Sequence, residues 1–283
     1  MQLYQQRDFG EKINATFQYA TQHFRSLGMA LLYIAGPVAL ASGIATGLYQ
    51  QSVFNALDQP VLLPYGSLFS ISYILSFLFS LLTNLAVSLT VYGHLRLYSH
   101  APDEPISVGA VWSEILAVFS QALVASALAA VVIIIGTLFL IVPGIYLGVV
   151  LSLAIVVTVF EDVPANQLFN RCFELIQGKW WSTFGLILVV ALIVWAMSLL
   201  FTLPLGVISL LRIMKVVPNI PGAVTVLTTI IGTVGRALLS SLLSLAIAFQ
   251  YFNLVERREG RGLLTAIDNL GTPPTESQRE DYY

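Results

Sequence analysis

The sequence predicts an all-α integral membrane protein with six transmembrane helices and three cytoplasmic amphipathic helices at the membrane interface. The first observation is composition, because 57% of the 283 residues are hydrophobic and only 10% are charged, against about 25% charged in soluble domains. The second is a set of six apolar runs, each about as long as a bilayer is thick. The third is that Lys and Arg gather between these runs. The single cysteine, Cys172, excludes an intramolecular disulfide.

The six apolar runs set the positions of the predicted spans, since a bilayer core needs about 20 helical residues. They are residues 27–48, 68–97, 117–141, 144–161, 182–203 and 224–254. The sixth run is longer than a bilayer requires, and Gly232 and Gly235 are its candidate break points. Residues 203–222 are too apolar for an ordinary outer loop, so we expect a short helix on the outer surface or, alternatively, a re-entrant segment.

The positive charges predict the orientation of the chain. With the N-terminus inside, ten of the thirteen Lys and Arg residues fall in inner segments, so both termini are expected to be cytoplasmic. Three regions follow: residues 1–26 as a cytoplasmic amphipathic helix, 27–255 as the six-span membrane domain, and 256–283 as a cytoplasmic tail that is disordered from about residue 272.

The stretch "VPANQLFNRCFELIQGKWWSTFG", residues 163–185, predicts one of the interfacial helices. Its apolar residues recur at steps of three and four, which is typical of an amphipathic helix. Indole and cationic side chains prefer the boundary between lipid and water. We therefore expect an interfacial anchor made of Arg171, Lys179, Trp180 and Trp181.

Two earlier segments show the same spacing, residues 9–24 before the first span and residues 106–120 before the third. Each of the three amphipathic segments precedes two spans. The chain therefore has the pattern of a threefold repeat of an interfacial helix followed by a span hairpin.

Residues 139–190 carry a more specific pattern: the apolar Pro-Gly-Ile turn at 143–145, an apolar span ending at Glu161, "RCFEL" from Arg171, and "GKWWSTFG" from Gly178. This pattern resembles the membrane domain of glycerophosphoryl diester phosphodiesterases, which also occurs in stand-alone, uncharacterised bacterial inner-membrane proteins. The resemblance implies a multi-pass protein of the bacterial inner membrane. It does not imply hydrolase activity, because that activity belongs to a separate barrel domain.

Polar residues inside the spans are the candidates for function, because they are costly in lipid and usually face the bundle interior. Asn84, Gln121 and Arg236 are the candidates for an intramembrane polar path. Two interpretations of Arg236 remain open: its side chain extends outward to the membrane surface, or it faces inward and contacts an anion or a lipid headgroup.

No catalytic, cofactor or metal site is predicted. The three histidines, His23, His94 and His100, lack the spacing of a strong metal site, and no hydrolase or nucleotide-binding motif occurs. The net charge of −2 indicates no nucleic-acid partner. We expect a non-catalytic module that binds membrane lipids or another membrane protein. A small transporter or channel is the alternative, and an enzyme acting on lipid ranks third.

Overall fold

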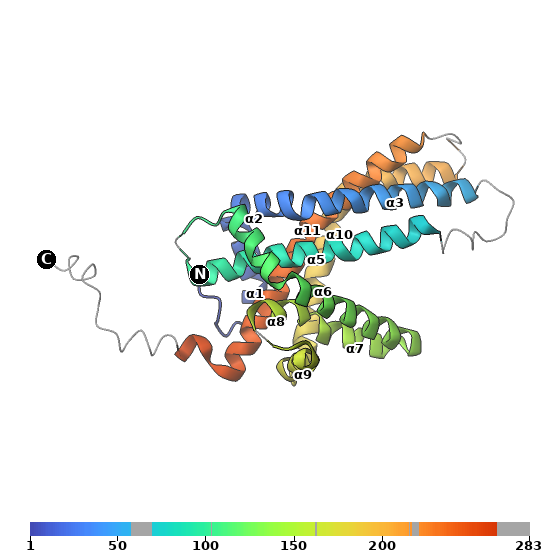
Figure 1. Cartoon of the computed structure of the whole chain (residues 1–283). Coiled ribbons are helices and arrows are strands. Elements are labelled where there is room, and N and C mark those ends of the chain that lie inside the picture. The colour runs from blue at the N-terminus through green and yellow to red at the C-terminus, as the bar shows by residue number, and fades with distance from the viewer. Residues whose placement is uncertain (58–69, 103, 162, 215, 217–220, 265–283) are drawn as a thin grey trace.

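Six long apolar helices dominate the structure (Figure 1). The computed structural model describes residues 1–57, 70–102, 104–161, 163–214, 216 and 221–264, and all regular structure within these ranges is helical. The segments that are long and apolar enough to cross a membrane are Phe24–Asn55, Ile71–His100, Val108–Phe139, Ile141–Phe160, Trp180–Ile213 and Gly222–Glu259. They confirm the predicted all-α fold with six candidate spans and indicate a multi-pass membrane protein.

The N-terminal part of the chain is a series of nearly continuous helices. The first is α1 (Phe9–Gln22), which begins at a capping box between Asp8 and Glu11. The candidate spans are then built from α2 (Phe24–Ala30), the π-helical turn η1 (Leu31–Ala35), α3 (Gly36–Leu57), α5 (Ile71–His100), α6 (Val108–Phe139), α7 (Ile141–Leu151), α8 (Ala154–Phe160), α10 (Trp180–Ile213) and α11 (Gly222–Glu259). The short helix α9 (Ala165–Ile176) separates α8 from α10.

The segment predicted as a second interfacial helix is not separate from its span. Ser107 caps the N-terminus of α6, accepting a hydrogen bond from the Ala110 amide at 3.2 Å, and the helix then runs unbroken to Phe139. Residues 108–115 are therefore the first two turns of α6. Helix α1 and helix α9 are separate elements, but the expected pattern of three detached helices is wrong at this position.

Helices α10 and α11 also run further than predicted. Pro204 lies inside α10, which continues to Ile213, so no short surface helix begins at residue 203. A proline removes one backbone donor, and an apolar helix tolerates this loss when its neighbours pack well. Helix α11 is unbroken at Gly232 and Gly235. A Cβ on Gly235 would lie 2.3 Å from Phe201 Cγ, so this glycine allows α10 to approach α11 closely.

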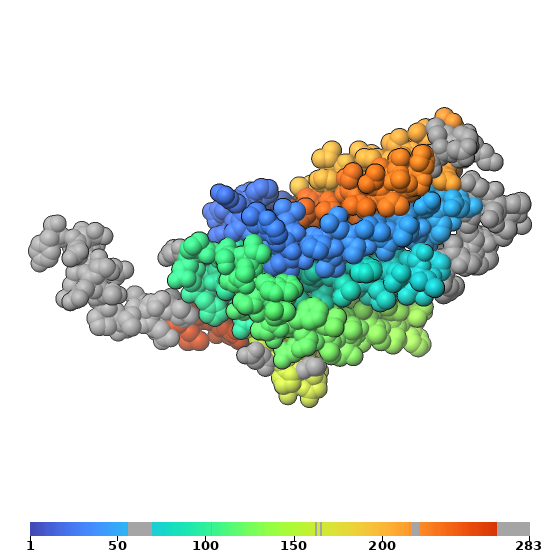
Figure 2. Space-filling model, turned by 45° about the horizontal axis from the view of Figure 1, so that its top comes forward, coloured from blue at the N-terminus to red at the C-terminus, as the bar shows by residue number. Residues whose placement is uncertain are grey.

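The helices form a four-helix group with a diverging hairpin. Helix α11 packs against α10, α3 and α5, and α3 packs against α5. Figure 2 shows the blue surface of α3 lying between the orange surface of α11 and the cyan surface of α5. The hairpin of α6 and α7 leaves this group at an angle in Figure 1, with its tip away from α9. The group contacts the hairpin mainly between α5 and α6, with a smaller contact between α10 and α7.

The densest part of the core lies at the end of the molecule where α1, α8 and α9 meet the C-terminal halves of α5 and α11. Large side chains there are almost fully buried, among them Tyr19, Val91, Tyr92, Leu95, Val157, Leu245, Phe249, Tyr251, Phe252 and Val255. At the opposite end, α3 and α11 approach through glycine. A Cβ on Gly43 or Gly47 would lie 2.9 Å from the Cα of Ile230 or Val226.

Candidate functional site

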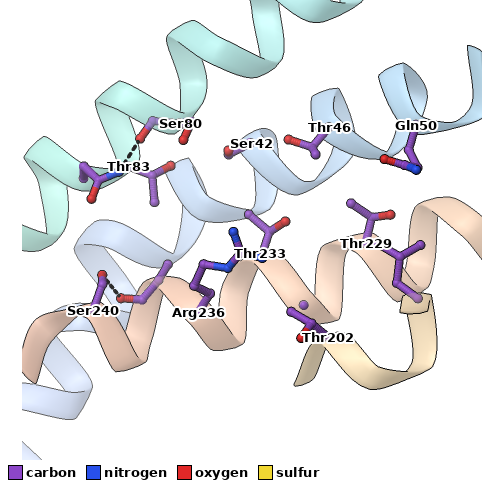
Figure 3. A pocket seen from close by; sticks show the side chains of 14 residues that line it. Ser42, Thr46, Gln50, Ser80, Thr83, Thr202, Thr229, Thr233, Arg236 and Ser240 are labelled. Carbon is purple, nitrogen blue, oxygen red and sulfur yellow. Dashed lines mark hydrogen bonds between the residues drawn. The ribbon is translucent and has the colours of Figure 1, made fainter. Parts of the chain in front are cut away.

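A polar cavity of about 320 Å³ lies between α3, α5, α10 and α11 (Figure 3). Ten of its fourteen lining residues carry a neutral hydroxyl or amide: Ser42, Thr46, Gln50, Ser80, Thr83, Asn84, Thr202, Thr229, Thr233 and Ser240. Arg236 is the cation among them, and the other three lining residues are Leu205, Gly232 and Ala237. This polarity contrasts with the apolar composition of the four helices that surround it.

Helical periodicity explains how the polar residues converge. Ser42, Thr46 and Gln50 are four residues apart on α3 and form one stripe along that helix. On α11, Thr229, Thr233 and Arg236 are spaced by four and three residues, so they also lie on one side of their helix. The polar stripes of two otherwise apolar helices therefore face each other across the cavity.

The cavity lies far from one end of the helices along their length, and it is open to the surface where Ser80, Asn84 and Arg236 are exposed. The N-terminus of α11 is next to the C-terminal part of α3, since a Cβ on Gly222 would overlap the Gln51 side chain. Measured from this end at 1.5 Å per residue, Arg236 lies about 21 Å along α11 from Gly222. The same measure places Ser42 about 22 Å from Leu57 on α3. The distances along α11 and α3 therefore place Arg236 and Ser42 at the same distance from this end of the bundle.

Arg236 faces into this cavity. Figure 3 shows its side chain extending from α11 into the space between α11 and α3. It forms no hydrogen bond or ion pair with any residue that the structure describes, and no described carboxylate lines the cavity. Arg236 is nevertheless exposed, so the cavity is open beside it. Its direction agrees with the inward interpretation of Arg236, while the distance from Arg236 to the membrane surface stays undetermined.

The three predicted path residues are only partly brought together. Asn84 and Arg236 both line the cavity. Gln121 lies on an exposed part of α6 and does not line it. Sequence reasoning missed the stripe on α3 and the threonines of α10 and α11, although their spacing of four residues is visible in the sequence.

The four residues predicted as an interfacial anchor occupy different environments. Trp181 is 77% exposed, as a lipid-facing indole would be, and Lys179 is exposed. Trp180 instead stacks on Phe184, with ring centroids 5.2 Å apart, and its Nε1 donates to the Tyr146 carbonyl at 3.3 Å. These contacts make Trp180 a packing residue at the start of α10.

Arg171 is the centre of an ionic network. Its Nε donates to Glu161 at 2.6 Å and its NH2 group donates to Glu161 at 2.9 Å and also to Glu259. Tyr251 donates to the same Glu161 carboxylate at 2.9 Å. Hydrogen bonding to Glu161 raises the pKa of Arg171 above its ordinary value. The network joins the end of α8, helix α9 and the end of α11, and all of its charges are paired.

A second polar cluster surrounds Lys12, which is 2% exposed. Its Nζ donates to Gln250 Oε1 at 2.8 Å and to Ser182 Oγ at 3.2 Å. The Gln250 Nε2 in turn donates to Thr183 Oγ1 at 2.7 Å. Burial, aided by the charge of Arg257, lowers the pKa of Lys12 to about 8. This cluster joins α1 to α10 and α11.

The histidines do not converge on a metal site. Within the described ranges, no group of three or more His, Cys, Asp or Glu residues could hold a metal ion. The two ring nitrogens of His94 contact Tyr19 Oη at 2.7 Å and Ser26 Oγ at 3.1 Å. His100 instead contacts the Arg96 carbonyl at 2.8 Å. The chain matches no protein-family model, no curated protein and no solved structure.

Proposed function

We propose that this is a non-catalytic, multi-pass protein of the bacterial inner membrane that binds membrane lipid. In this proposal a lipid headgroup occupies the polar cavity between α3, α5, α10 and α11. Both termini are cytoplasmic, and the chain belongs with the stand-alone relatives of the phosphodiesterase membrane domain that its residues 139–190 resemble. The observation that carries the proposal is the cavity, which places ten neutral polar side chains and Arg236 within apolar helices.

The cavity must hold something polar. Unpaired polar groups cost several kcal/mol each in hydrocarbon, and Ser42, Thr46, Gln50 and Thr233 form no hydrogen bond with described residues. Water or a polar ligand therefore completes the site. Its volume of about 320 Å³ falls at the small end of ligand pockets, which suits a headgroup whose acyl chains remain in the bilayer.

The packing beyond the cavity favours binding over open conduction. Ser88 and Ser244 meet at 3.2 Å between α5 and α11. Next to them, Leu245, Phe249 and Tyr92 are at most 2% exposed. These side chains close the cavity toward α1 and α9, so a bound group would remain in a pocket and would not pass along a continuous path.

The test is lipid retention after the cavity is filled. Thr233→Phe places a large apolar side chain in the cavity, whereas Gln121→Phe makes a comparable change on the exposed part of α6. Both proteins are purified in mild detergent, and their bound lipids are counted by native mass spectrometry. We expect Thr233→Phe to lose bound lipid and Gln121→Phe to keep it. Equal lipid retention in the two variants would contradict the proposal.

A small transporter is the second candidate, favoured by the position of Asn84 and Arg236 in one cavity. It requires a second conformation in which the packing around Phe249 opens. Reconstituted vesicles that show solute flux, reduced by Thr233→Phe and not by Gln121→Phe, would favour transport over static binding.

A further inference from the structure

The charge and hydrogen-bonding pattern of the cavity identify a class of ligand. We propose that the cavity selects an anionic, phosphate-bearing headgroup that also carries hydroxyl groups, with the phosphate placed at Arg236. This inference rests on the proposed lipid-binding function and adds the chemistry of the headgroup.

The first argument is charge. Arginine stays protonated in proteins, and its guanidinium presents a planar set of donors that suits phosphate oxygens. Arg236 forms no ion pair with any described residue, and no described Asp or Glu lines the cavity. The described lining therefore carries one positive charge, on a side chain that is exposed at the opening of a cavity between apolar helices. A ligand of net negative charge neutralises it, whereas a zwitterionic headgroup leaves it uncompensated.

The second argument is the distribution of donors and acceptors. Several lining side chains use their own hydrogens within their helix, so that their oxygens remain as acceptors. Asn84 Nδ2 donates to the Ser80 carbonyl at 3.1 Å, and Thr83 Oγ1 donates to the Phe79 carbonyl at 2.7 Å. Thr202, Thr229 and Ser240 donate in the same way.

The remaining polar groups are available as donors. Ser42, Thr46, Gln50 and Thr233 have no hydrogen-bond partner among the described residues and lie with Arg236 along α3 and α11. The Ser80 hydroxyl on α5 also has no partner among these residues. Phosphate oxygens accept hydrogen bonds and hydroxyl groups donate them. A phosphate beside Arg236 can accept from the donors of α3 and α11, and hydroxyl groups of the same headgroup can donate to the oxygens of Thr83 and Asn84 on α5. Phosphatidylglycerol has this headgroup chemistry, and phosphatidylethanolamine is the zwitterionic comparison.

The test compares these two lipids. The full chain is reconstituted in nanodiscs with equal parts of both, extracted in mild detergent, and analysed for retained lipid. We expect enrichment of phosphatidylglycerol, and we expect Arg236→Gln to reduce its binding about 10- to 100-fold, the range for losing a hydrogen-bonded charge. Arg236→Lys should restore part of the enrichment. Arg212→Gln removes a cation outside the cavity and should leave the enrichment intact.

Each outcome separates this inference from the proposed function. Loss of all lipid in Thr233→Phe with unchanged lipid preference in Arg236→Gln would overturn the anionic selection and keep lipid binding. Soluble glycerophosphate that raises the melting temperature of the wild type and not of Arg236→Gln would support the anion at Arg236 and count against a lipid source. Because Arg236 has no described partner, Arg236→Gln should melt within a few degrees of the wild type. A strongly destabilised Arg236→Gln that Arg236→Lys fully restores without any lipid enrichment would assign Arg236 a structural role and overturn the inference.

Discussion

Replacing Glu161 by Gln should destabilise the protein far more than the same change at Glu174. Both carboxylates pair with Arg171, but their surroundings differ. The side chain of Glu161 is 8% exposed and that of Arg171 is 16% exposed, whereas Glu174 is 51% exposed. Glu161 also accepts hydrogen bonds from both Arg171 and Tyr251, each at 2.9 Å on the same oxygen, Oε1. The structure therefore provides a buried carboxylate and a matched exposed one around one guanidinium.

The expected magnitude follows from burial. Removing one partner of a buried ion pair costs about 3 to 5 kcal/mol, because the other charge remains desolvated. Since Glu259 continues to pair with Arg171, we expect the low end for Glu161→Gln, about 3 kcal/mol. Exposed pairs contribute about 0 to 1 kcal/mol, so Glu174→Gln should cost less than about 1 kcal/mol.

The measurement is reversible unfolding in mixed micelles with a rising fraction of denaturing detergent, followed by circular dichroism. Each variant replaces one carboxylate oxygen by an amide nitrogen, and the two variants have the same net charge. The difference between their free energies of unfolding therefore reports the local environments of the two carboxylates. The reasoning would be refuted by equal free energies of unfolding for the two variants, or by a larger loss for Glu174→Gln.

Two further predictions concern packing and pH. Gly47→Ala should cost about 1 to 3 kcal/mol of stability, since the added Cβ would lie 2.9 Å from Val226 Cα. Gly148→Ala is the control and should cost less than about 1 kcal/mol, because its Cβ meets nothing within 4 Å. Equal melting temperatures of the two variants would contradict this prediction. The Lys12 pKa is lowered to about 8 from 10.5, so the unfolded chain binds more protons between these values and stability should rise with pH across that window. Lys12→Met should remove this rise when unfolding is measured from pH 7 to 10, and an unchanged slope would show that Lys12 does not cause it.

The six spans could be predicted because each depends on the length and apolarity of one continuous stretch. The same local reasoning failed where a neighbouring helix changed the outcome. The fifth span was expected to end at residue 203, and α10 instead continues past Pro204 to Ile213. Gly235 was expected to permit a break in α11, and it instead accommodates Phe201.

The environment of Arg171 in the candidate anchor also could not be predicted from the local sequence. Its position in an amphipathic stretch predicted a residue at the lipid boundary, because the sequence places charged and aromatic groups together there. Its partner Glu259 is 88 residues away. Only the folding of α9 against the end of α11 turns that cation into the centre of a paired network.

For the candidate site, the sequence by itself determined that Asn84, Gln121 and Arg236 are polar residues within apolar runs, and that each is costly to leave unpaired in lipid. Which of them share a site was decided by tertiary structure. The cavity requires α3, α5, α10 and α11 to meet, and the close contacts at Gly43 and Gly47 fix the approach of α3 to α11. A helix's polar stripe is a periodic property of one segment, but the stripe that it faces depends on how separate helices rotate and pack. That is why Arg236 faces Ser42 and Thr46 across a cavity while Gln121 lies outside it.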